Sequence, residues 1–151
     1  MELGFLDDYS LWVTEISKKY KVKPSNELNV YLSGLVEEIA EHEYEKSETE
    51  IGDVLCYWML CVNHFGSSAT LLLSKNKVAA IPSPWYLVKE LSGQLKRLNR
   101  GDENEENLMS ALALTLFYID SEIKALNTSF LEVIKINKEK LESRKAFPVV
   151  K

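Results

Sequence analysis

Two acidic pairs stand on either side of a short polar break in this sequence. Glu38 and Glu41 precede the break at residues 45–47. Glu50 and Asp53 follow it. The members of each pair are three positions apart, so on a helix both carboxylates lie on one face, one turn apart. If the break is a tight turn between antiparallel helices, Glu41 lies level with Glu50. Glu38 then lies one turn further from the break, level with Asp53, and the four carboxylates can converge on one small volume.

Carboxylates gathered in this way could hold a divalent cation. Like charges a few ångströms apart oppose each other's ionisation, so the cluster must either face solvent or be held together by a cation. Ligand oxygens in this number suit a hard ion, which indicates Mg²⁺, with Mn²⁺ as a substitute. The alternative is an ordinary charged helix hairpin, in which Glu50 only completes a capping box opened by Ser47.

The spacing of apolar residues predicts the helices that must position these groups. Segments with helical periodicity occur at about 3–20, 26–44, 48–65, 84–100, 105–126 and 130–144. No segment shows sustained alternation with a period of two, so we expect an all-α fold. Residues 66–83 show only a loose pattern, and we expect a connector there.

A weak internal repeat relates the two halves of the chain. Residues 35–41 align with 87–93, and residues 53–57 align with 114–118. Under this pairing the four acidic positions 38, 41, 50 and 53 correspond to Glu90, Gly93, Ala111 and Leu114. We therefore predict a duplicated helix hairpin, with halves at about 26–65 and 84–126, whose second copy lost its acidic centre. The two copies would pack into a four-helix core within one domain spanning 1–151.

Composition excludes several classes of protein. A net charge of −5 leaves no basic excess for neutralising phosphates, which argues against a nucleic-acid-binding protein. No apolar run reaches the roughly 18 residues that a membrane crossing needs, and the first residues do not have the pattern of a secretory signal. Cys56 and Cys61 form neither a C-x-x-C motif nor a disulfide framework, so we expect reduced core residues. These features together predict a cytoplasmic protein.

An N-x-x-K-L-x-x-R stretch near the end of the sequence is formed by Asn137, Lys140, Leu141 and Arg144. With this stretch, the two acidic pairs and the apolar run after the second pair, the chain resembles the MazG-like, all-α nucleoside triphosphate pyrophosphohydrolase superfamily. The resemblance covers most of 26–65 and 105–144 and is weak across 66–83. Simple members of the family are shorter, but here a long insertion separates the acidic hairpin from the tail, so the chain looks closer to the duplicated plan of the related dimeric dUTPases. In those proteins an internally duplicated chain keeps its metal ligands in one half.

The resemblance implies a house-cleaning activity on the nucleotide pool. It implies hydrolysis of a nucleoside triphosphate between the α and β phosphates, giving the monophosphate and pyrophosphate, in a homo-oligomer (dimer or tetramer). Mg²⁺ held by the four carboxylates would polarise phosphoryl oxygens and stabilise the leaving group. Either Glu41 or Glu50 could take the proton from the attacking water, and the spacing does not choose between them.

Other residues of the same motifs are candidates for binding the substrate. Asn137, Lys140 and Arg144 fall on one stripe of the last predicted helix, where cations could bind phosphates. Tyr57 and Trp12 could hold the base. The alternative roles are a solvated helix end for the stripe and core packing for the aromatic rings.

Two questions stay open. A non-catalytic helical module that binds nucleotide or a protein partner would share most of these features. The preferred base and sugar are also open, with dUTP, dCTP, a broad range of dNTPs or an alarmone as candidates. A second basic cluster, Lys96, Arg97 and Arg100, is expected to form a solvated face.

Overall fold

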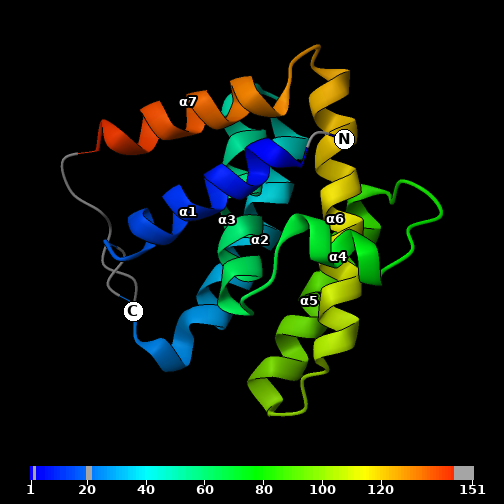
Figure 1. The fold of residues 1–151 in the computed structure, drawn as a ribbon. Coiled ribbons are helices and arrows are strands. Elements are labelled where there is room, and N and C mark those ends of the chain that lie inside the picture. The colour runs from blue at the N-terminus through cyan, green and yellow to red at the C-terminus, as the bar shows by residue number, and fades with distance from the viewer. Residues whose placement is uncertain (2, 20–21, 145–151) are drawn as a thin grey trace.

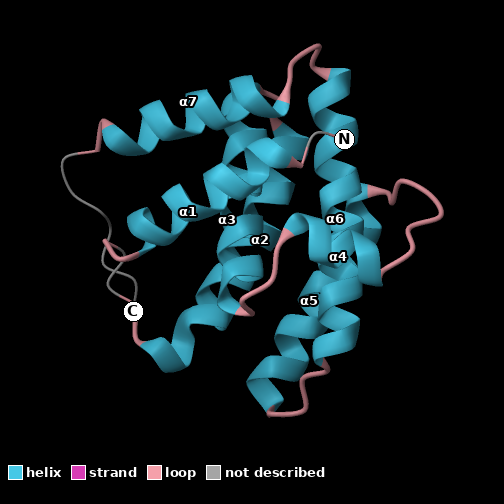
Figure 2. Cartoon of the chain, in the orientation of Figure 1, coloured by secondary structure: helices cyan, strands magenta, loops and turns pink. Residues whose placement is uncertain are grey.

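Seven α-helices and one short 3-10 helix make up the regular structure of the computed structural model, which describes residues 1, 3–19 and 22–144 (Figures 1 and 2). The elements are α1 (Gly4–Ser17), η1 (Pro24–Asn26), α2 (Glu27–Tyr44), α3 (Glu48–His64), α4 (Ala69–Lys75), α5 (Pro84–Arg100), α6 (Glu105–Ala125) and α7 (Phe130–Glu142). No strand occurs among the described residues. The expected all-α fold is confirmed.

Local side-chain caps explain where most of these helices begin. Ser47 accepts a hydrogen bond from the backbone N–H of Glu50 at 3.1 Å, and Ser129 accepts one from Glu132 at 3.2 Å. Ser83 caps α5 in the same way, with proline in the first turn. These contacts satisfy N–H groups that have no partner within the helix. At the other end of α5, Gly101 adopts the left-handed conformation with φ of 76°, which a glycine takes without steric cost.

Residues 66–83 are not simply a connector, because they contain α4. Ser68 caps this helix by accepting a hydrogen bond from the backbone N–H of Leu71 at 3.1 Å. The helix has seven residues and buries only Ala69 and Leu72. Two buried positions are too few to show a helical period in the sequence, and the expectation of an irregular segment was therefore wrong over 69–75.

Helix α3 lies at the centre of the packing. It contacts α2, α6, α7 and α1, while α5 packs against α2 and α6. Figure 1 shows α1 and α7 running beside one another across one end of the molecule, with the α5–α6 hairpin at the other side. Residues 58–62 of α3 are buried without interruption, because neighbours surround the helix. The four-helix core and the internal repeat stay predictions, since helix contacts alone do not establish a duplication.

The two cysteines belong to this core. Cys56 and Cys61 are free and buried, as expected from their place in an apolar helix. Burial raises the pKa of the Cys56 thiol to about 12, so it is protonated at neutral pH and unreactive. Among the described residues, no helix combines the length and the apolar character that a membrane crossing requires.

Candidate metal centre

The hairpin of α2 and α3 brings three of the four predicted carboxylates together. Glu38, Glu50 and Asp53 each offer an oxygen, and these oxygens lie within 4.8 Å of one another. Glu41 lines the same pocket but is exposed and stands outside this close group. The tight turn at 45–47 sets the register, because it makes α2 and α3 antiparallel neighbours. The predicted quartet is therefore a half-buried group of three with a fourth, exposed member at the rim.

The carboxylates line a pocket of about 270 Å³ between α2, α3 and α7. Its walls are formed by Glu38, Glu41, Glu50, Asp53, Cys56, Tyr57, Lys140, Leu141 and Arg144. At about 30 Å³ for each water in the liquid, this volume holds roughly nine waters. Small-molecule pockets usually start at about 300 Å³, so the space suits cations and phosphate groups, while the rest of a nucleotide would extend beyond it.

The pocket is electrostatically strained. The pKa of Glu38 is raised to about 8, first by burial and then by the charges of Asp53, Glu41 and Glu50, while Lys140 opposes the shift. Burial and then the charges of Asp53, Glu41 and Glu45 raise the pKa of Glu50, while Lys140 opposes the shift. The Oε2 atoms of Glu38 and Glu50 are buried and have no hydrogen-bond partner among the described residues. Buried oxygens in this state are costly, and a bound cation would offset that cost.

Asp53 differs from the other two carboxylates because α7 already supplies it with partners. The Lys140 ammonium lies 2.6 Å from Asp53 Oδ2, and the amide nitrogen of Asn137 donates to Oδ1 at 3.5 Å. Asn137 is itself fixed by the Tyr9 hydroxyl, which donates to its Oδ1 at 2.6 Å. Since Asn137 is only 1% exposed, it positions Asp53 and is not available to a ligand in solvent.

The remaining two residues of the basic stripe reach the pocket. Lys140 is partly exposed at its wall, and Arg144 lines it as well. They reach it because α7 packs closely on α3 at Gly52. A Cβ atom at Gly52 would lie 3.4 Å from the Cβ of Asn137, which is van der Waals contact between the two helices.

The two aromatic candidates are placed differently. Tyr57 lines the pocket, and its ring packs so closely over Gly34 that any side chain there would overlap it. Trp12 belongs instead to the contact between α1 and α7. Its ring stacks on Tyr9 with centroids 5.9 Å apart, and its indole N–H donates to Glu142 at 3.2 Å. The structure thus brings Tyr57, but not Trp12, to the carboxylates.

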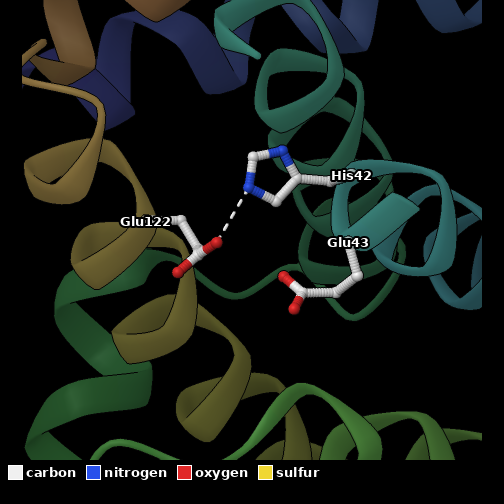
Figure 3. Close-up of side chains that lie close together, drawn as sticks. All are labelled: His42, Glu43 and Glu122. Carbon is white, nitrogen blue, oxygen red and sulfur yellow. Dashed lines mark hydrogen bonds and ion pairs between the residues drawn. The ribbon is translucent and has the colours of Figure 1, made fainter. Parts of the chain in front are cut away.

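A second cluster of potential ligands lies between α2 and α6. His42, Glu43 and Glu122 each offer one ligand atom within 4.8 Å of the others, and Figure 3 shows His42 and Glu43 facing Glu122 from α2. His42 Nε2 lies 3.0 Å from Glu122. The Lys46 ammonium is 2.8 Å from Glu122 and 3.3 Å from Glu43, and Tyr118 donates to Glu43 at 2.8 Å. The Lys46 ammonium pairs with both carboxylates, and the contacts of His42 with Glu122 and of Tyr118 with Glu43 tie α2 to α6.

The pKa of Glu122 reflects this pairing. Burial raises it, but the hydrogen bonds from Lys46 and His42 outweigh burial, and the net pKa lies below the ordinary value. Sequence reasoning missed this cluster because residues 42 and 122 are far apart along the chain. A partial signal existed, since His42 continues the buried stripe of Leu35 and Ile39 on α2.

Comparison of the chain with protein-family models, curated proteins and solved structures gave no match. The structure brings seven of the predicted site residues to the pocket wall, namely Glu38, Glu41, Glu50, Asp53, Tyr57, Lys140 and Arg144. Asn137 lies behind Asp53, and Trp12 lies elsewhere.

Proposed function

We propose that this chain is a Mg²⁺-dependent nucleoside triphosphate pyrophosphohydrolase, which converts a (d)NTP and water into the (d)NMP and pyrophosphate. The observation that carries the proposal is the pair of buried, unpartnered carboxylate oxygens of Glu38 and Glu50 in one group with Asp53. A metal-free protein gains nothing from such an arrangement, because mutual repulsion and burial both oppose ionisation. A divalent cation with oxygen ligands removes both penalties.

The donor set fits a hard ion. Carboxylates alone, with space for waters, are the ligands that Mg²⁺ and Mn²⁺ accept. Glu38, Glu50 and Asp53 would hold the ion, and when bound it would polarise phosphoryl oxygens and neutralise the charge on leaving pyrophosphate. Glu41 stands outside the close group at the exposed rim. Its carboxylate is therefore the better candidate to take a proton from the attacking water.

Helix α7 supplies the contacts for phosphate. In the absence of a divalent ion, the Lys140 ammonium pairs with Asp53. A bound cation would take over the charge of Asp53 and release Lys140 toward the phosphates. Arg144 at the same wall offers a planar guanidinium, which can bind a phosphate in a bidentate manner. Tyr57 is the remaining candidate for stacking on the base.

The competing function is a non-catalytic nucleotide-binding or interaction module. The Asp53–Lys140 pair favours this module, because the Lys140 ammonium neutralises one of the carboxylates without a metal ion. We further propose that the enzyme acts in the cytoplasm as a homo-oligomer. Light scattering tests the oligomeric state independently of activity.

A turnover assay separates the enzyme from the binding module. A panel of NTPs and dNTPs is incubated with Mg²⁺, and nucleoside monophosphate and pyrophosphate are both measured. We expect turnover by the wild type and a loss of about 100-fold or more in Glu41→Gln, which is the usual scale for removing a general base. The matched control is Glu37→Gln, an exposed carboxylate on the same helix that lies outside the pocket wall, and its rate should stay near that of the wild type. Absence of turnover for every triphosphate, or an unchanged rate in Glu41→Gln, contradicts the proposal.

A further inference from the structure

The α5–α6 hairpin carries a pocket of its own, with a volume of about 430 Å³. The sequence repeat pairs the four acidic positions of the first hairpin with Glu90, Gly93, Ala111 and Leu114. All four of these residues line this second pocket. The alignment was made from sequence alone, so their meeting at one pocket is an independent indication that the two pockets occupy corresponding places in the two hairpins.

The second pocket differs from the first in the groups that it presents. Only Glu90 keeps a carboxylate, and one carboxylate is too few to hold a divalent cation. The other three positions carry small or apolar residues, and the pocket is larger than the 270 Å³ of the first. In the second pocket, the space that corresponds to the metal centre of the first is therefore open to another ligand.

The charge of the pocket wall is also reversed. Lys89 and Arg97 line the second pocket with Glu90, so two cations face one carboxylate and the formal charge is +1. The first pocket sets Lys140 and Arg144 against four carboxylates, which gives a formal charge of −2. An anion can thus approach the second pocket without a metal ion. Arg97, expected from sequence to lie on a solvated face, is exposed but also borders this pocket.

The wall contains an unsatisfied amide. Gln94 lines the pocket and is only 8% exposed, and its Oε1 has no hydrogen-bond partner among the described residues. A buried amide oxygen without a donor is destabilising, and such groups in folded proteins usually have a partner. Tyr86, 46% exposed, adds an aromatic ring to the same wall. The two cations match the phosphate of a nucleotide. The amide of Gln94 matches the polar edge of its base, and the ring of Tyr86 matches the face of the base.

We propose that the α5–α6 pocket binds a nucleotide without a divalent cation, as a second site separate from the metal centre. Lys89 and Arg97 hold the phosphate, Tyr86 contacts the base, and Gln94 accepts a hydrogen bond from it. The volume lies within the usual range of about 300–1,000 Å³ for small-molecule sites. The proposal does not depend on catalysis at the first pocket.

The test is calorimetric titration of the full chain in EDTA, with nucleoside monophosphates, nucleoside triphosphates and inorganic phosphate as probes. We expect at least one nucleotide to bind with Kd below about 1 mM and to bind more tightly than inorganic phosphate. The double variant Lys89→Gln/Arg97→Gln should weaken binding at least tenfold. Both residues are exposed, so their replacement leaves the core intact.

Three further variants keep the result interpretable. Lys96→Gln, an exposed cation next to Arg97 but outside the pocket wall, and Glu37→Gln, an exposed carboxylate outside both pocket walls, should both bind as the wild type does. Gly93→Leu should block the pocket, because a Cβ at Gly93 meets no atom within 4 Å and the larger side chain can enter the free space. No saturable binding in EDTA, equal binding of inorganic phosphate, or unchanged binding in the double variant and in Gly93→Leu overturns the proposal.

Discussion

Replacing Glu38 by glutamine should make the metal-free protein more stable. Glutamine keeps the size of the side chain and removes the charge that burial and three neighbouring carboxylates oppose. The expected effect is unusual, because most substitutions of partly buried residues destabilise a fold. It follows from the proposal that these carboxylates hold a cation, which EDTA removes under the conditions of the measurement.

The magnitude follows from the pKa of Glu38, which rises from 4.5 to about 8 on folding. Above pH 4.5 the unfolded chain releases this proton while the folded chain keeps it. Stability that is fully present below the unfolded pKa is therefore lost as the pH rises toward the folded pKa. At 1.36 kcal/mol for each pKa unit the whole shift amounts to several kcal/mol. Because the side chain is only partly buried, solvent screening reduces this to about 2 kcal/mol.

The assay is thermal or urea unfolding in EDTA at two pH values. At about pH 8.5 we expect Glu38→Gln to gain about 2 kcal/mol over the wild type, equivalent to about 4–8 °C in Tm for a chain of this size. At about pH 4.5 the gain should fall to a few tenths of a kcal/mol, because the carboxyl is then protonated in the folded state and about half protonated in the unfolded state. Glu37→Gln serves as the control and should show no gain at either pH. A less stable Glu38→Gln in EDTA at the higher pH, or a gain independent of pH, would refute the reasoning.

Three further substitutions test other parts of the site. Asp53→Asn should lower metal-free stability by about 1 kcal/mol in urea unfolding, in contrast to Glu38→Gln, because it leaves Lys140 without its partner at 2.6 Å; an increase would contradict this. Gly34→Ala should cost about 1–3 kcal/mol in thermal unfolding, because its methyl group would overlap the Tyr57 ring, and a neutral result would mean that the ring moves freely. Glu122→Gln should destabilise the chain at neutral pH. Folding lowers the pKa of Glu122, so the stabilisation by this carboxylate is present above pH 4.5, its ordinary pKa, and is lost as the pH falls through the folded pKa. A stability difference between Glu122→Gln and the wild type that persists in strong acid would contradict this prediction.

Local rules predicted most of the fold. The caps at Ser47, Ser83 and Ser129 act over three residues, so the sequence shows them directly. The meeting of Glu38 with Asp53 also followed from local rules, because helical spacing and a tight turn fix which positions are level. Helix α4 was missed since its seven residues bury too little to show a period.

Long-range packing decided what the sequence did not show. From the sequence, both Tyr57 and Trp12 could reach the pocket. The structure shows that Trp12 instead lies in the contact between α1 and α7, where it bonds Glu142. The pairing of His42 with Glu122 joins residues 80 positions apart, which no local pattern predicts. The burial of Asn137 behind Asp53 likewise depends on how closely α7 approaches α3.

Titration of Mn²⁺ into the metal-free chain tests the acidic pocket most directly, with loss of the paramagnetic resonance signal of the free hydrated ion as the readout. We predict saturable uptake at about pH 8 that Mg²⁺ displaces. Glu38→Gln and Glu50→Gln should each weaken it at least tenfold, or by about 1.4 kcal/mol, while Glu37→Gln leaves it unchanged. Absence of uptake by the wild type, or uptake that neither amide variant weakens, would contradict the account.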